Sequence, residues 1–204
     1  GGKKMKNKRI IISIILLFIV ILSACSISTN IPETWQTYKC DVKHLHLITT
    51  INVYKGSEKY GYIKGENFII KNVHDPLTLY NLNGDVIATA GDKYHFISQD
   101  SHSVVDANGN LKVEMAGNID LWGESYVLYD EEHGVVGYFS VGGTNTIGTI
   151  EDADGNVVVK YGSLPIFDDY NLYISPECPI DDDAVILIFA SYFSDIAGDR
   201  NNNN

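Results

Sequence analysis

Cys25 is the residue whose chemistry the sequence indicates most clearly, because its thiol directly follows a segment with the pattern of a cleaved leader. Residues 6–9 are mostly basic, and Ile10–Leu22 is an apolar run interrupted by one serine. A basic stretch, an apolar stretch and small residues at the cleavage point are the pattern of a secretory signal peptide. The sequence therefore predicts that residues 1–24 are removed and that Cys25 becomes the first residue of the mature chain.

The four residues Leu22-Ser23-Ala24-Cys25 fit the lipobox of bacterial lipoproteins, in which the cysteine thiol receives a diacylglyceryl group. A membrane-spanning helix is the alternative, but Ile10–Ala24 rises only about 22 Å, against a hydrocarbon core of about 30 Å. We expect a palmitate-type lipid anchor on the extracytoplasmic side of a bacterial cell membrane. Residues 1–4 are Gly-Gly-Lys-Lys, whose codons can be GGA and AAA, the bases of a ribosome-binding site. We therefore expect that Met5 is the native start.

Two more thiols, Cys40 and Cys178, are left as a pair in a compartment where disulfides persist. A bond between them would close a loop of about 138 residues, worth about 4–5 kcal/mol in the loop-entropy model. The alternative is two free thiols that pack as small apolar residues in the core. The sequence leaves both possibilities open.

Histidines and acids form no recognisable catalytic or metal pattern. His44 and His46 lie on one face of an expected strand and are spaced to share a metal, but spacing identifies no third ligand. Asp152-Ala-Asp-Gly155 is similar to part of a calcium loop, yet Ile150 and Tyr161 stand where that register requires acids, which favours a hairpin turn. The remaining histidines match no triad order or glycine-flanked nucleophile; they are His74, His95, His102 and His133. We expect no metal, no cofactor and no enzyme activity.

Charge narrows the range of partners. Five of the 15 basic residues and none of the 26 acidic ones lie in residues 1–24, so removal of that segment changes the net charge from −11 to −16. Phosphate binding depends on clustered Lys and Arg, which makes nucleic acid and anionic lipid headgroups poor partners for such a chain. Membrane association is expected through lipid on Cys25, and the remaining partner classes are a protein or a small molecule.

After a tether at residues 25–39, the sequence reads as one β-rich domain at 40–199 with a short disordered tail at 200–204. Its tight-turn signals are Asn83-Gly84, Asn108-Gly109, His133-Gly134 and Asp154-Gly155. Such turns predict an antiparallel meander, and this many strands favour closure into a barrel or a two-sheet sandwich. The expected strands are 44–54, 60–64, 67–72, 77–81, 85–90, 94–98, 103–106, 111–116, 125–129, 135–141, 146–150, 156–161 and 170–174.

The exception is a predicted helix at about 181–197. Asp181-Asp182-Asp183 supplies an N-cap and first-turn acids, and Gly198 is a candidate C-terminal stop. Val185–Phe189 is apolar without interruption, so the helix is apolar on every face and must be surrounded by other residues. The simplest arrangement places it along the axis of a closed barrel.

Over residues 40–199 the sequence resembles the tubby C-terminal-like superfamily, in particular the LURP-one-related family. The residues that carry the resemblance are Asn81-Leu-Asn-Gly84, Asp106-Ala-Asn-Gly-Asn110, Asp152-Ala-Asp-Gly-Asn156, Tyr170-Asn-Leu-Tyr-Ile174 and the apolar helix that ends at Asp195-Ile196. The resemblance implies a closed antiparallel barrel of about twelve strands around a central hydrophobic C-terminal helix.

The resemblance carries little function with it. Tubby-type phosphoinositide sites are basic, whereas the densest lysines here, within residues 55–71, are interleaved with Glu58 and Glu66. No phosphoinositide residue can be transferred to this chain, and a fold does not by itself supply a function. We expect a non-catalytic binding or structural module. The alternatives are a cell-envelope hydrolase whose site assembles in space, and a lipid-handling module related to scramblases.

Overall fold

The computed structural model describes residues 31–42, 50–65, 76–91, 101–120, 123–142, 147–163 and 169–202. The residues outside these ranges include the predicted leader (residues 1–24), Cys25, His44, His46, His74 and His95, so the structure does not bear on them. Residues Glu33–Asn204 form one compact unit. The buried core described in it lies between Tyr38 and Tyr192, so the unit encloses its own core and we expect it to fold without the leader.

In the described part of the chain, twelve antiparallel strands close into a barrel in which each strand pairs with its neighbours in sequence and β1 pairs with β12. The strands are β1 (Gln36–Val42), β2 (Ile51–Lys55), β3 (Glu58–Gly65), β4 (Leu77–Asn81), β5 (Val86–Gly91), β6 (Ser101–Asp106), β7 (Leu111–Asp120), β8 (Gly123–Tyr129), β9 (Val135–Val141), β10 (Ile147–Asp152), β11 (Val157–Ser163) and β12 (Tyr170–Ile174). The prediction of a closed antiparallel barrel of about twelve strands is confirmed.

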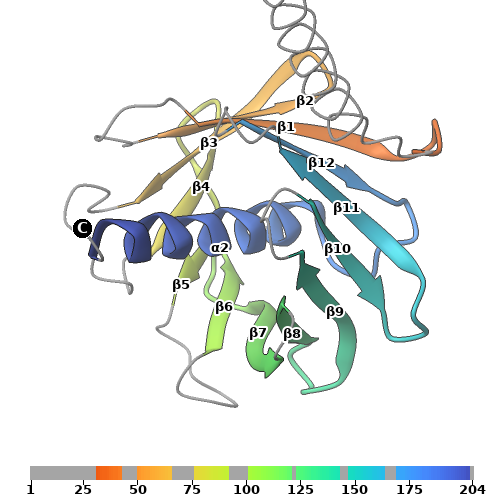
Figure 1. Cartoon of the computed structure of the whole chain (residues 1–204). Helices are drawn as coiled ribbons and strands as arrows, with labels where there is room; N and C mark the ends of the chain where they lie inside the picture. Colours follow the sequence, from red (N-terminus) through yellow and green to blue (C-terminus); the bar gives the residue numbers. More distant parts are fainter. Residues whose placement is uncertain are drawn as a thin grey trace, which may run out of the picture. The chain divides into compact units, whose positions relative to one another are not determined.

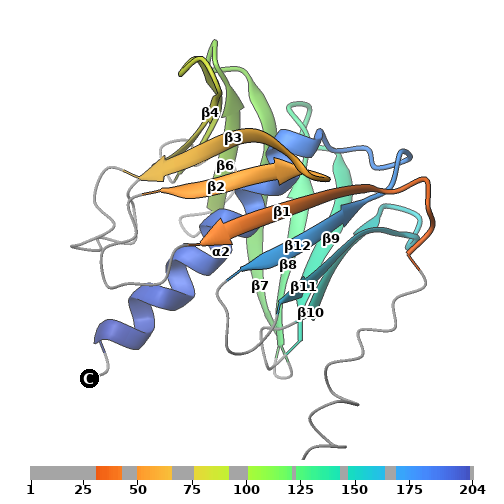
Figure 2. The same ribbon diagram turned by 90° about the horizontal axis from the view of Figure 1, so that it is seen from above.

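A single helix among the described residues, α2 (Asp182–Asn202), runs through the barrel. Figure 1 shows it crossing between β1–β3 on one side and β5–β9 on the other. Figure 2, the view from above, shows it passing under β1–β3. Ala184–Ala190 is almost entirely inaccessible to solvent, which confirms the predicted central helix. None of the described helical residues makes a helix long and apolar enough to cross a membrane.

The helix approaches β5 most closely, and the side chains explain why. Ala88 and Ala90 are the residues of β5 that face the interior, and both are buried. Because the alanine side chain is a single methyl group, the helix can pack closer to β5 than it could against a larger side chain. On other strands the interior is filled by larger residues, and Phe139 of β9 meets Phe189 of the helix edge to face at 5.0 Å between ring centroids.

Two predicted boundaries are wrong. Residues 36–39, assigned to the tether, belong to β1, where Tyr38 and Cys40 face the interior and are buried. The domain therefore begins at Gln36, because β1 supplies the pairing partner that β12 needs to close the barrel. The helix also continues through Gly198 to Asn202, so Gly198 is not a stop and the predicted tail is helical as far as residue 202. The predicted strands 67–72 and 94–98 lie outside the described residues.

Candidate functional site

One mouth of the barrel, called here the turn mouth, carries four hairpin turns of the same construction. In each turn the side-chain oxygen of the first residue accepts hydrogen bonds from the backbone N–H groups of the third and fifth residues. Asp106 Oδ1, for example, accepts from Asn108 N and Asn110 N, both at 2.8 Å. The turns are Asn81–Asp85, Asp106–Asn110, Asp130–Gly134 and Asp152–Asn156.

These bonds settle what the turn acids do. Bonds from Asn110 and Asn108 lower the pKa of Asp106, and bonds from Asn156 and Asp154 lower the pKa of Asp152. Both carboxylates therefore stay ionised at neutral pH and are occupied within their own turns. The segment similar to a calcium loop is a hairpin turn, as expected, and the described residues contain no cluster of three or more potential metal ligands.

The fourth residue of each turn has a positive φ angle. It is glycine in three turns, namely Gly84, Gly109 and Gly155, but in the turn Asp130–Gly134 it is His133, with φ of 62°. His133-Gly134 was predicted as a tight-turn signal and does lie in a turn, but the positive φ angle is that of the histidine. Gly134 instead keeps the fifth position free of a Cβ atom, which would lie 3.0 Å from an Asp130 carboxylate oxygen.

At the same mouth, α2 enters the barrel through a set of polar contacts that the sequence did not predict. Tyr38 of β1 donates to Asp182 at 2.6 Å, and Tyr60 of β3 donates to Asp183 at 2.5 Å. Burial and the neighbouring carboxylates raise the pKa of both phenols, so both remain protonated donors. The entrance of the helix is thus tied to strands on one side of the barrel.

Lysines complete this helix entrance. Lys55 lies 3.8 Å from Asp182 and 5.3 Å from the centre of the Tyr38 ring. On another strand, β7, Lys112 bonds to Asp181. The Asp181 carbonyl oxygen accepts from Val185 N at 3.0 Å, which makes Asp181 the N-cap as predicted. The acids at this entrance therefore hold the helix in place.

Cys40 and Cys178 are both free thiols in the structure, so the possible disulfide is not formed there. Cys40 lies opposite Tyr170 at one end of β12, whereas Cys178 follows the other end, beyond Ile174. Four residues of extended strand cover about 13 Å, more than the roughly 4–7 Å that a disulfide allows between Cα atoms. Burial raises the pKa of Cys40 to about 12, so its thiol stays protonated and packs as a small apolar residue.

The described residues do not assemble a catalytic triad on β6 and β7. Ser103 and Glu114 face each other across these strands and are both buried. Ser103 donates to the Gly91 carbonyl oxygen at 3.3 Å. His102 is adjacent in sequence, but alternation along a strand turns its side chain to the opposite face. The side chains of Ser103 and Glu114 therefore lie on one face of the sheet, and the side chain of His102 lies on the other.

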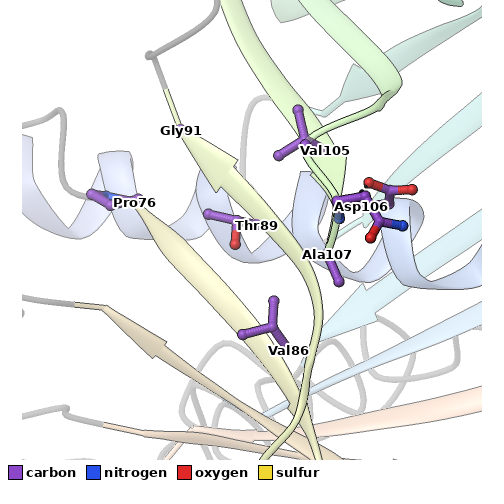
Figure 3. A pocket seen from close by; sticks show the side chains of 9 residues that line it. Pro76, Val86, Thr89, Gly91, Val105, Asp106 and Ala107 are labelled. Atoms are coloured by element: carbon purple, nitrogen blue, oxygen red, sulfur yellow. Dashed lines mark hydrogen bonds between the residues drawn. The ribbon is translucent and has the colours of Figure 1, made fainter.

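A hollow of about 340 Å³ lies on the outer face of the barrel beside the turn mouth (Figure 3). Val86, Thr89 and Gly91 of β5 form one wall, and Val105 of β6 with residues 106–109 forms another. Pro76, just before β4, closes one end. The sequence did not reveal this site, because its residues come together only through strand pairing.

Comparison with known proteins bears on the fold alone. No protein-family model matches this sequence, and no curated protein matches it. Among solved structures, the X-ray structure of a protein from Arabidopsis thaliana is similar, with 10% sequence identity and a TM-score of 0.55. The similarity covers 80% of this chain and 93% of the Arabidopsis chain.

Proposed function

We propose that this chain is a bacterial lipoprotein, held on the extracytoplasmic side of the membrane by lipid on Cys25, whose barrel is a non-catalytic binding or structural module. The observation that carries the second half of this proposal is the filled interior. The axis of the barrel, where many β-barrels hold a ligand, is occupied here by the apolar residues of Ala184–Ala190. Binding would therefore take place on the outer surface and at the mouths.

The chemistry of the described side chains supports the same proposal. At the turn mouth, Asp106 and Asp152 are occupied in their own turns, and Asp181, Asp182 and Asp183 hold the helix entrance. A general acid or base must be free to meet a substrate. Acids that serve turns and helix ends are better suited to a rigid binding surface than to catalysis.

We further propose that the domain belongs to the tubby C-terminal-like superfamily, in the LURP-one-related family. The twelve-stranded closed barrel with a C-terminal helix along its axis is the architecture that the sequence resemblance implies. The lipobox before the domain is an addition to the usual cytoplasmic forms of that family. A fold alone assigns no ligand, so this proposal concerns ancestry and architecture.

Lipid anchoring is tested by Cys25→Ala in the full chain, expressed in a bacterium that processes lipoproteins. We expect the wild-type protein to fractionate with membranes and to incorporate labelled fatty acid. The variant should lose the label and leave the salt-washed membrane fraction or accumulate unprocessed, because the lipobox offers no other acyl acceptor. Cys178→Ala is the matched control and should behave as wild type. Processed Cys25→Ala protein that resists salt extraction from membranes would contradict the anchor.

A further inference from the structure

The β4–β5 hairpin, which forms one wall of the hollow, carries two aliphatic side chains that folding does not bury. Val86 lines the hollow and is 40% exposed, whereas Val105 on the opposite wall is 6% exposed. Leu82 does not line the hollow but lies in the turn that leads to Val86, and it is 61% exposed, the largest fraction among the large hydrophobic residues described. Single exposed aliphatic residues are ordinary on protein surfaces. Two on one hairpin, beside a hollow whose wall includes Val105 and Pro76, form an apolar surface suited to a partner.

The charge around the hollow is negative. Asp106 lines it and keeps its charge because hydrogen bonds from Asn110 and Asn108 lower its pKa. Asp85, which precedes Val86, accepts a hydrogen bond from Asn81 Nδ2 at 2.9 Å. Within residues 76–91 and 101–120, Lys112 is the one lysine or arginine, and it bonds to Asp181 at the helix entrance. No basic side chain of these two hairpins is therefore available to neutralise the two aspartates.

Backbone hydrogen bonds hold the β6–β7 turn, which lines the hollow, and the β4–β5 turn, which directly precedes the lining residue Val86. In the β6–β7 turn, Gly109 N donates to the Asp106 carbonyl oxygen at 3.0 Å, in addition to the bonds to the Asp106 side chain. In the β4–β5 turn, Asn81 N donates to the Asp85 carbonyl oxygen at 2.9 Å. A partner would meet a surface whose shape is already fixed, so little ordering cost would offset its binding energy.

From this combination we infer that the hollow is the docking site for a cationic amphipathic segment of another protein. An aliphatic side chain of the segment fills the hollow against Val86 and Val105, and flanking Lys or Arg side chains lie near Asp85 and Asp106. The volume of about 340 Å³ is near the lower end of ligand pockets, roughly 300–1,000 Å³, which suits one or two side chains. An anionic lipid surface is disfavoured by the same two aspartates. This inference rests on the proposed function as a binding module and adds the class of partner.

Three labelled peptides of equal length test the chemistry by fluorescence anisotropy with the domain 26–204. One has a leucine face and lysines, one has the same leucines with glutamates, and one has the same lysines with serines. We expect the first to bind most tightly and to weaken between low salt and about 0.5 M, because screening reduces charge pairing. Equal binding of the leucine–glutamate or the lysine–serine peptide would overturn the inference.

Position is tested with two matched variants, Val86→Ser and Val135→Ser. Both valines are 40% exposed and each begins a strand directly after one of the four turns. Val86→Ser should weaken binding of the lysine–leucine peptide roughly five- to tenfold, and Val135→Ser should leave it unchanged. Equal effects would refute the location. Concentration-dependent self-association that Val86→Ser abolishes would assign the surface to a second copy instead. Fractionation of Cys25→Ala measures anchoring separately, so either proposal can fail alone.

Discussion

His133 adopts a conformation that costs energy at a single residue. Among the described residues it is the one non-glycine residue with a positive φ, at 62°, in a position that the three related turns fill with Gly84, Gly109 and Gly155. A Cβ atom makes the left-handed region unfavourable by about 1 kcal/mol or more. The strain persists because the bonds that Asp130 accepts from Glu132 and Gly134 hold the turn closed.

His133→Gly should therefore stabilise the domain by about 0.5–1 kcal/mol. The gain is smaller than the full strain because glycine also increases the entropy of the unfolded chain. The measurement is the urea midpoint of the domain 26–204 at neutral pH, compared with wild type at equal slope.

Gly109→Ala is the complementary variant. A Cβ atom at Gly109 would meet nothing within 4 Å, so its effect reports the φ angle of +88° and not a steric clash. We expect a loss of about 1 kcal/mol. A neutral Gly109→Ala would contradict the positive φ angle at Gly109, and a destabilising His133→Gly would mean that the contacts of the His133 side chain outweigh the strain of its backbone.

At the scale of elements, α2 and the barrel stabilise each other. Residues 184–190 have no solvent-facing side, and the barrel interior has no other described element to fill it. Neither part is therefore expected to stay folded alone. The polar contacts of Asp182 and Asp183 with Tyr38 and Tyr60 fix where the helix begins relative to β1 and β3.

Leu187→Asp should be among the most damaging single changes in this chain. Leu187 is fully buried, so the substitution places a carboxylate in an apolar interior and leaves a cavity, at a cost of about 4 kcal/mol or more. That is comparable to the 5–15 kcal/mol that holds a typical domain together. We expect loss of the cooperative transition in chemical denaturation.

Leu82→Asp makes the same chemical change at a leucine that is 61% exposed, and should cost less than about 0.5 kcal/mol. If Leu187→Asp unfolds at the same denaturant concentration as Leu82→Asp, or if truncation after Asp183 leaves a cooperatively folded domain, then the helix is peripheral and does not form the core of the barrel.

The sequence was sufficient for elements with strong local signals. The predicted bounds of β4, β9 and β12 coincide with the observed ones, because alternating apolar residues there end at turns or loops with little ambiguity. β1 was missed because its alternation, with Tyr38 and Cys40 inward, follows directly from a Ser, Thr and Pro-rich stretch without a turn signal.

Contacts between distant residues were beyond sequence reasoning. Tyr38 and Asp182 are 144 positions apart, and Tyr60 and Asp183 are 123 apart. Val86 and Val105 reach the same hollow only because β5 pairs with β6 in a register that single-sequence patterns do not specify. The site residues predicted from sequence were the cysteines Cys25, Cys40 and Cys178, whereas the surface we propose for binding is built from aliphatic side chains and turn backbone.

At the scale of the whole molecule, the topology of the barrel gathers turns, the helix entrance and acidic residues at one mouth. The four hairpin turns and the entrance of α2 share the turn mouth, which gathers the acids of residues 130–132, 152–154 and 181–183. β1 also begins at this mouth, at Gln36. With lipid on Cys25, about 11 residues join the anchor to the barrel, and they reach at most about 40 Å. The anchor would therefore hold an acidic end within reach of the bilayer.

Such an end should be repelled by anionic lipids. Without residues 1–24 the chain has a net charge of −16, and within the turn mouth Lys55 and Lys112 already contact Asp182 and Asp181. Binding to phosphate-bearing surfaces requires clustered basic side chains and falls with salt. We expect the domain 26–204, which lacks the acyl acceptor, to stay in the supernatant when sedimented with phosphatidylserine or phosphoinositide vesicles at physiological salt.

Vesicles of phosphatidylcholine alone are the uncharged control. The domain should stay in the supernatant with these vesicles as it does with the anionic ones. Lower ionic strength distinguishes repulsion by the acidic surface from weak binding through a basic site. Removing the screening strengthens repulsion between like charges, which reduces sedimentation, whereas it tightens binding through a basic site, which increases sedimentation. Sedimentation with phosphoinositide vesicles that increases at low salt would show such a site and would favour a tubby-type lipid function over the acidic docking surface. Absence of sedimentation at both ionic strengths would mean that the barrel itself has no affinity for anionic lipid, so that membrane attachment would depend on the proposed lipid on Cys25.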